Sequence, residues 1–303
     1  MDSSSSSPTL NEAYVTMFAG KGGVGKTTCA AATALHYASL GEEALVISTD
    51  PTPSLSHIFE VRDRQKPVKV SEGLYLAELG MDEVKQMWDE KFGREVYEVF
   101  SSFVSVSYER FADFITSVLP GLSDEFTVDY IKGLAQRKRY ARIVWDTAPL
   151  GQTLGLLQTP SMLGRHLKPA PRIYSRLKIG RRSRRPILKI LEQWAELSSL
   201  DVSFIREEVE FNLVTIPEAL AVEQLDRIFE ELARHGLRLE RIIVNNVVRD
   251  PDSPFLEEKA SAQRGYLDAI RAKAGGIPVV ELPLFSREVR GEALERMATL
   301  LYP

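Results

Sequence analysis

A loop between residues 20 and 28 holds the side chains whose types and spacing point most directly to chemistry. It consists of Gly20, Lys21, Gly22, Gly23, Val24, Gly25, Lys26, Thr27 and Thr28. This order matches the complete pattern G-x-x-x-x-G-K-[ST] of a phosphate-binding loop. Glycines let several backbone N–H groups face one anion, the Lys26 ammonium is expected at the β- and γ-phosphates, and the Thr27 hydroxyl is expected to bind Mg²⁺. The sequence therefore predicts a site for a nucleoside triphosphate with Mg²⁺.

Two carboxylates follow apolar runs that have the length and composition of buried strands. Residues 44–48 lead to Asp50, and residues 141–146 end in Asp146. Ligands of open α/β sheets bind beyond the carboxyl ends of the strands, so both carboxylates are expected to face the phosphates. Asp50 is expected to activate the attacking water, the alternative being a purely structural role at the start of a turn. Thr27, Asp50 and Asp146 are the expected metal-site residues, with the carboxylates acting through water.

The elements that must position these side chains follow from hydrophobic periodicity. The apolar run 13–18 predicts a buried strand and residues 27–40 a helix, which gives the loop its required strand–loop–helix context. Further strands are predicted at 73–79, expected at the sheet edge, and at 211–216, 241–246 and 277–282, with helices at 218–235 and up to residue 301. The fold class expected is α/β: a doubly wound, mostly parallel sheet of the P-loop NTPase type with an α-helical insertion subdomain.

The same pattern predicts the domain organisation. The nucleotide-binding α/β domain is expected to comprise residues 11–80, 138–160 and 209–303, and the helical subdomain residues 81–137 and 161–208. The serine-rich residues 1–10 are expected to form a disordered tail.

Aromatic residues recur at helical intervals within the predicted insertion. The stripe includes Phe100, Phe103, Phe111 and Phe114. Such stripes are more often helix core than binding surface, but an apolar groove for a hydrophobic client has the same sequence pattern. The sequence leaves both interpretations open.

A basic run extends from Arg165 to Lys189 and contains ten lysines and arginines. Its members are Arg165, Lys168, Arg172, Arg176, Lys178, Arg181, Arg182, Arg184, Arg185 and Lys189. One interpretation is a solvated loop and helix, and the other is a contact with an acidic partner or an anionic membrane surface, near which each cation contributes about 1 kcal/mol.

Composition narrows the functional classes. A net charge of −4 disfavours general binding to nucleic acid, and neither a run of about 18 apolar residues nor a signal peptide is recognisable, so we expect a cytoplasmic protein, at most peripheral to a membrane. Cys29 is the single cysteine, which makes an intramolecular disulfide or a cysteine-based zinc site within one chain impossible. We expect ATP and Mg²⁺ as ligands, and no zinc.

The segment from Asp146 to Pro160 carries a resemblance to a known family. Its order D-T-A-P-L-G-Q-T-L, continuing to L-L-Q-T-P, resembles the arsenite-pump ATPases and the ATPases that target tail-anchored membrane proteins. Lys21 makes the phosphate loop similar to the family's deviant form, in which this lysine reaches the nucleotide of a homodimer partner. The resemblance implies ATP hydrolysis with Asp50 as the hydrolytic switch residue, although Thr52 and Pro53 depart from the family's Asp-Pro-Ala-His.

The resemblance also implies which residues contact the adenine base of the nucleotide. Asn245 is similar to the family residue that hydrogen-bonds adenine, and Pro283 and Leu284 lie in a segment similar to the one beside it. The Cys-x-x-Cys pair that shares zinc across the dimer in eukaryotic targeting members has no counterpart at residues 249–276. Three functions remain open: targeting of hydrophobic membrane-protein clients, energising an anion or arsenite efflux pump with a membrane partner, and a partition-type regulatory role on a membrane or nucleic-acid surface.

Overall fold

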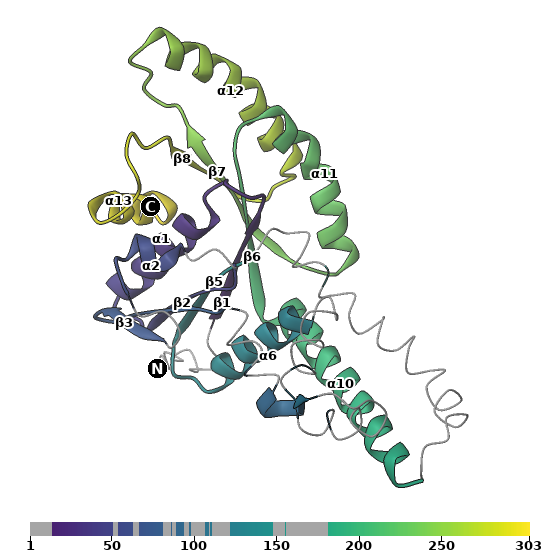
Figure 1. Ribbon diagram of the computed structural model, residues 1–303. Helices are drawn as coiled ribbons and strands as arrows, with labels where there is room; N and C mark the ends of the chain where they lie inside the picture. The colour runs from purple at the N-terminus through teal and green to yellow at the C-terminus, as the bar shows by residue number, and fades with distance from the viewer. Residues whose placement is uncertain are drawn as a thin grey trace, which may run out of the picture.

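A single mixed sheet with helices on both faces forms the frame of the protein in the computed structural model (Figure 1). The structure describes residues 14–50, 54–62, 67–80, 122–147 and 181–303, together with 86, 89–93, 97, 107, 108, 110 and 155. Within this part of the chain, no helix is long and apolar enough to cross a membrane.

Eight strands make up the sheet, in the order β3-β4-β2-β5-β1-β6-β7-β8. They are β1 (Tyr14–Gly20), β2 (Ala44–Ser48), β3 (Val68–Ser71), β4 (Leu74–Glu78), β5 (Arg142–Asp146), β6 (Val209–Thr215), β7 (Leu239–Val247) and β8 (Val279–Pro283). Only β3 runs antiparallel to its neighbour within this sheet. The central strands β1, β2 and β5 are apolar and almost wholly buried, as expected for parallel strands covered on both faces. The predicted α/β class is confirmed.

One face of the sheet is covered by α1 (Lys26–Ser39), α2 (Leu55–Ile58) and α13 (Glu292–Leu301). The buried side of α1 consists largely of alanines, Ala30, Ala31, Ala32 and Ala34, none of which is exposed. Small side chains let this helix approach the strands closely, which holds its N-terminus at the carboxyl edge of the sheet. The phosphate loop is therefore fixed by a tightly packed helix.

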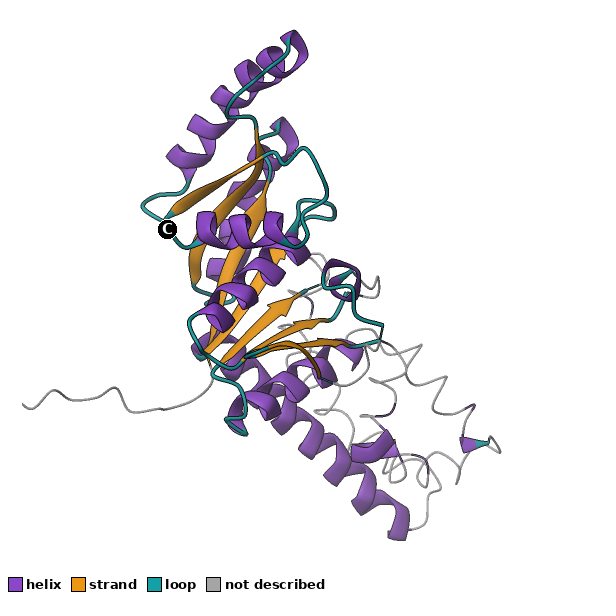
Figure 2. Ribbon diagram, turned by 90° about the vertical axis from the view of Figure 1, so that its left-hand side faces the viewer, coloured by secondary structure: helices purple, strands orange, loops and turns teal. Residues whose placement is uncertain are grey.

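The opposite face is covered by α6 (Leu122–Gln136), α10 (Arg181–Glu207), α11 (Ala219–Arg234) and α12 (Pro254–Lys273). The helix α10 packs against the core through Phe204 and Ile205 near its C-terminal end. Its N-terminal part extends well beyond the sheet (Figures 1 and 2). A buried ion pair between Lys132 of α6 and Asp201 of α10 joins these two helices.

Two elements differ from the sequence prediction. The strand predicted at the sheet edge, β4, lies one position inside it, because the short strand β3 pairs with it antiparallel. The helix α12 was not predicted, although its start is marked: Pro254 occupies the first turn, and the hydroxyl of Ser253 accepts a hydrogen bond from the Leu256 amide at 3.4 Å. Within the expected helical subdomain, the structure describes the helices α6 and α10 and a π-helical turn at Asp89–Gly93. These elements do not test the boundaries between the two domains, which stay a prediction.

Candidate functional site

The phosphate loop connects the end of β1 to the start of α1. Gly20 closes the strand, and a Cβ atom at this position would lie 2.3 Å from the Val214 carbonyl oxygen of β6. Gly25 immediately precedes α1 with φ +98°, a backbone conformation that side chains disfavour. The next backbone amides belong to the first turn of α1, where they lack helical acceptors. The loop therefore has the geometry of an anion site at a helix N-terminus.

The two lysines of the loop have different surroundings. Lys26 is buried, and its Nζ donates to the Lys21 carbonyl oxygen at 2.9 Å. Burial lowers the pKa of Lys26, while Asp146 and Asp50 partly offset that effect. The side chain of Lys21 is exposed. The Lys26 ammonium is thus hydrogen-bonded to the backbone of the loop, whereas the Lys21 side chain is exposed to solvent.

Asp146 is the most deeply buried carboxylate of the site. Its Oδ2 accepts hydrogen bonds from the hydroxyls of Thr27 at 2.9 Å and Ser48 at 3.0 Å. Its Oδ1 is buried and has no hydrogen-bond partner within the described part of the chain. Burial raises the pKa of Asp146 to about 6, against the opposing effect of the two hydroxyls and Lys26. A buried carboxylate with one unpaired oxygen can accept a further hydrogen bond, for example from a metal-bound water.

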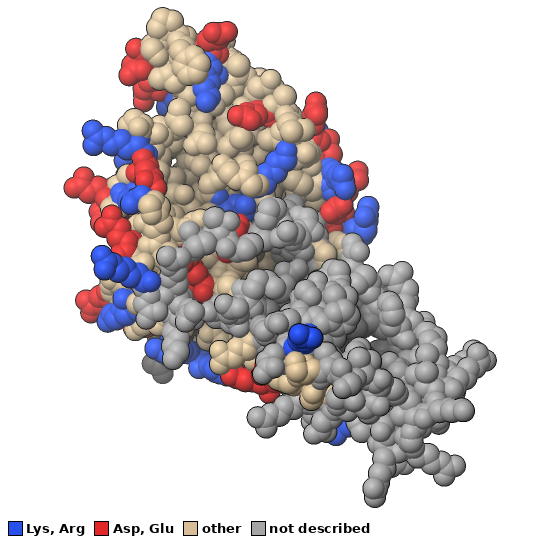
Figure 3. Space-filling view, viewed as in Figure 1, with Lys and Arg blue, Asp and Glu red and all other residues tan. Residues whose placement is uncertain are grey.

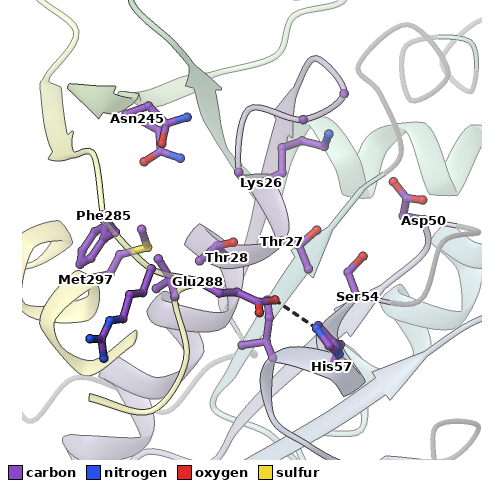
Figure 4. Close-up of a pocket in the computed structure, with 17 residues that line it drawn as sticks. Lys26, Thr27, Thr28, Asp50, Ser54, His57, Asn245, Phe285, Glu288 and Met297 are labelled. Atoms are coloured by element: carbon purple, nitrogen blue, oxygen red, sulfur yellow. Dashed lines mark hydrogen bonds and ion pairs between the residues drawn. The ribbon is translucent and has the colours of Figure 1, made fainter. Parts of the chain in front are cut away.

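Asp50 lies in the pocket near Ser54 and Thr27, away from Asn245 (Figure 4). It follows β2 by two residues, and its backbone amide donates to the Ser48 hydroxyl at 3.3 Å. Its side chain is half-buried and lines the pocket with Lys26 and Thr27. The structure therefore brings together the phosphate loop and both strand-end carboxylates.

A pocket of about 570 Å³ opens over these residues. Its lining comprises Gly22, Gly23, Gly25, Lys26, Thr27, Thr28, Asp50, Ser54, His57, Ile58, Asn245, Asn246, Phe285, Arg287, Glu288, Val289 and Met297. This volume falls in the range of small-ligand and cofactor sites. Of the other loop residues, Gly20, Lys21 and Val24 are not part of the lining.

Asn245 stands at the end of the pocket away from Asp50, near Phe285 and Met297 (Figure 4). Its Nδ2 donates to the Val24 carbonyl oxygen at 3.0 Å, and its Oδ1 is buried without a partner among the described residues. Pro283 ends β8, and the predicted Pro283 and Leu284 precede the pocket wall, which begins at Phe285. An unpaired acceptor beside an aromatic and a thioether side chain suits a flat base that carries an amino group.

Sequence reasoning did not connect the charged side chains of two segments that meet at one wall of the pocket. His57 of α2 contacts Glu288 at 3.0 Å and also Arg290, and Arg290 pairs with Glu288 at 2.6 Å and with Glu60 at 3.7 Å. These contacts join α2 to the segment before α13 over 231 residues of sequence. Only the fold brings them together, since neither segment has a recognisable spacing of its own.

Other predicted residues lie outside the described part of the chain. These are the groove candidates Phe100, Phe103, Phe111 and Phe114, and the basic run up to residue 180. The remainder of that run lies in the first part of α10, where Lys189 is exposed. The space-filling view shows the described acidic and basic side chains mixed over the visible face of the α/β core (Figure 3).

The residues present fit ATP with Mg²⁺. Hydroxyl and carboxylate oxygens of Thr27 and Asp146 are the hard ligands that Mg²⁺ prefers, and Mg²⁺ commonly keeps waters between itself and a carboxylate. The glycine cradle, Lys26 and Asn245 with its unpaired Oδ1 line one pocket. Asp146, whose Oδ1 is also unpaired, is hydrogen-bonded to Thr27 of that lining. Among the described residues there is no group of three histidine, cysteine or acidic side chains arranged to hold a metal.

Comparison with known proteins agrees with this site. Residues 13–303 match the family of anion-transporting ATPases. ATPase GET3A of Arabidopsis thaliana is 30% identical over 294 residues, which cover 91% of this chain and 80% of the relative. The ATPase get3 of Neurospora crassa is 28% identical over 93% of this chain and 88% of its own length. A protein of Aquifex aeolicus, named as a candidate arsenical pump-driving ATPase, is 30% identical over 95% of this chain and 98% of its own length.

Proposed function

This chain belongs to the anion-transporting ATPase family and hydrolyses ATP, and we propose that it uses the reaction to shield hydrophobic transmembrane segments of membrane proteins during their delivery. Its relatives at about 30% identity carry both pump-driving and GET3 names, so their names alone do not choose between the two roles. The choice rests on the chemistry available in this chain.

The observation that carries the choice is the position of its single cysteine. Cys29 is on the buried side of α1 with no exposed surface, and burial raises the pKa of its thiol to about 12. The family resemblance implies that pump members bind arsenite through thiols, and a thiol must be accessible and deprotonated to act as such a ligand. A lone thiol that is buried and protonated offers no such site, which argues against thiol-based arsenite binding and favours client handling.

The architecture supplies a second support. The helix α10 is anchored on the sheet near Phe204 and Ile205 and continues away from the α/β core (Figure 2). A long helix fixed at one end transmits movement of the core to whatever its far end carries. We infer that residues 81–137 and 161–208 form the client-binding subdomain, with Phe100, Phe103, Phe111 and Phe114 facing the client.

The residues of the pocket take the following roles in this proposal. Lys26 and the loop amides bind the β- and γ-phosphates, while Thr27 and Asp146 hold Mg²⁺, Asp146 through water. Mg²⁺, when bound, neutralises charge on the phosphate oxygens. Asp50, which lines the pocket with Lys26 and Thr27, orients and deprotonates the attacking water. Asn245 and Phe285 hold the base.

The proposed active form is a homodimer. Lys21 is exposed and directly precedes Gly22 of the pocket lining, and its long side chain reaches the nucleotide of the partner protomer in this proposal. The protein works in the cytoplasm and docks peripherally on anionic membranes through the basic run, five of whose members lie in the first nine residues of α10 without an acidic residue among them.

The proposal can be tested by co-expressing the protein with a single hydrophobic transmembrane segment and purifying the complex from the soluble fraction. Wild type is compared with Asp50→Asn, which is expected to bind ATP without hydrolysing it and so to retain more client. Serine replacements of Phe100, Phe103 and Phe111 are expected to abolish capture while ATP binding stays intact.

Phe255 offers a matched control, because it is 72% exposed on α12 and far in sequence from the proposed groove. Phe255→Ser should capture the segment as wild type does. Equal losses in Phe255→Ser and in the groove variants, or absence of any complex with Asp50→Asn, would refute the client role.

A further inference from the structure

We propose that Ser48 is a positioning residue for ATP hydrolysis, which fixes the backbone of Asp50 relative to the carboxylate of Asp146. Ser48 is the last residue of β2 and is 1% exposed. The inference rests on the roles proposed above for Asp50 and Asp146. It adds a residue that neither the phosphate-loop pattern nor the strand-end carboxylates pointed to.

The hydroxyl of Ser48 contacts both carboxylate-bearing segments. It donates to Asp146 Oδ2 at 3.0 Å and accepts a hydrogen bond from the Asp50 amide at 3.3 Å. A hydroxyl has one donor and two acceptor lone pairs, so both bonds can exist at once. One buried oxygen atom thus links the strand end that holds the metal-site carboxylate to the strand end that holds the hydrolytic one.

The sheet register explains why this link is short. Ser48 is paired with Asp146 of β5 on one side and with Glu78 of β4 on the other. Paired residues of parallel strands point to the same face, so these three polar side chains form one buried row at the carboxyl edge. The row is hydrogen-bonded to α1 through Thr27 and to α2 through Ser56.

Glu78 contributes the second anchor of the segment that follows Asp50. Its Oε1 accepts a hydrogen bond from the Ser56 amide of α2 at 3.1 Å. Asp50 and Ser56 are therefore each tied by a backbone amide to a buried side chain of the same row. A displacement of the Asp50 backbone would break its hydrogen bond to Ser48. Ser56, further along the same segment, is held by Glu78.

Removal of the Ser48 hydroxyl has two direct consequences. The Asp50 amide loses the Ser48 hydroxyl as its acceptor. Asp146 Oδ2 loses the Ser48 donor and keeps the hydrogen bond from the Thr27 hydroxyl. Loss of a group that orients a metal-site ligand commonly costs 10- to 100-fold in activity or metal affinity. Because alanine is close to serine in volume, this loss would come without a large change in packing.

The experiment measures steady-state ATP hydrolysis and the binding of a fluorescent ADP analogue with Mg²⁺ and with EDTA. For Ser48→Ala we expect kcat to fall about 10- to 100-fold, while the KM for ATP changes less than about threefold. The enhancement of analogue affinity by Mg²⁺ should also fall about tenfold or more, and affinity in EDTA should not change. Urea unfolding checks that the variant remains folded.

Two further variants separate hydrogen bonding from packing. Ser48→Cys fills the same space with a weak donor, so it should behave like Ser48→Ala if the hydrogen bonds matter and like wild type if only volume matters. Ser198→Ala removes a hydroxyl that is equally buried, at 2% exposure on α10, and should leave kcat unchanged. Wild-type kcat in Ser48→Ala or in Ser48→Cys would overturn the inference.

Asp50→Asn distinguishes failure of this inference from failure of the proposed site. An inactive Asp50→Asn beside a fully active Ser48→Ala would refute the role of Ser48 alone. A fully active Asp50→Asn would refute the hydrolytic role of Asp50, and the coupling proposed for Ser48 would be refuted with it. An inactive Asp50→Asn with the losses expected for Ser48→Ala and Ser48→Cys would support both.

Discussion

Substitution of Gly25 by alanine should damage the site through two separable effects, strain and collision. Gly25 has φ +98°, and an added Cβ would lie 2.3 Å from Nδ2 of Asn245. Holding a side chain in such a backbone conformation costs about 1–3 kcal/mol. The collision would push Asn245 away from the Val24 carbonyl oxygen, which breaks a buried hydrogen bond at about 1–3 kcal/mol. Together Gly25→Ala should lower the free energy of unfolding by about 2–6 kcal/mol.

Gly23 provides the matched control for this prediction. It has φ +77° in the same loop, but an added Cβ would meet nothing within 4 Å, so Gly23→Ala should show the strain alone, about 1–3 kcal/mol. Adding Gly25→Ala to Asn245→Ala should likewise cost only the strain, because the colliding amide is gone. Urea unfolding without nucleotide measures all four variants. Equal losses in Gly23→Ala and Gly25→Ala, or strict additivity of Gly25→Ala with Asn245→Ala, would refute the collision.

Three further predictions concern buried ionisable groups. Lys132→Met should destabilise the protein by about 3–5 kcal/mol in urea unfolding, because the Asp201 carboxylate, with a side chain 4% exposed, loses the ammonium of Lys132. The double variant Lys132→Met/Asp201→Leu should recover most of this loss, and a single-variant loss below about 1 kcal/mol would contradict the prediction. Cys29 should resist a disulfide thiol reagent in the native state and react once urea unfolds the chain, and rapid native labelling at pH 8.5 would contradict its burial. Since burial raises the pKa of Cys29 from 9.0 to about 12, the folded state keeps a proton that the unfolded chain releases, so this thiol should lower stability as the pH rises from about 9 toward 12.

Much of the fold was predictable because its signals are local. The strands around Val46 and Val144 are apolar runs that end in polar side chains able to take part in catalysis. The glycine-rich sequence between β1 and α1 is compatible with few structures other than a phosphate-binding loop. Their order along the chain predicts a parallel sheet with a ligand site at its carboxyl edge. The structure has that arrangement, and Lys26, Thr27, Asp50 and Asp146 meet there.

What sequence could not predict depends on contacts between distant segments. The strand β3 is only four residues long, and its place at the edge follows from pairing with Tyr75 and Leu76 of β4. Ser48 looks like the unremarkable end of an apolar run, and its role emerges only from the register that sets it beside Asp146. The same holds for His57, whose partner Glu288 is 231 residues away. Contacts between such distant residues cannot be predicted from local patterns in a single sequence.

Two hydrogen bonds of the phosphate loop use side chains that are proposed to bind the nucleotide. Lys26, proposed to bind phosphate, donates to the Lys21 carbonyl oxygen, and Asn245, proposed to bind the base, donates to the Val24 carbonyl oxygen. The unpaired oxygens of Asp146 and Asn245 have the opposite energetic effect, because a bound ligand would give each of them a hydrogen-bond partner. A bound nucleotide is therefore expected to exchange internal hydrogen bonds of the loop for bonds to itself and to give both buried acceptors a partner. Because the Ser48 hydroxyl hydrogen-bonds to Asp146 and to the Asp50 amide, we expect binding in the pocket to affect the position of Asp50 through these contacts.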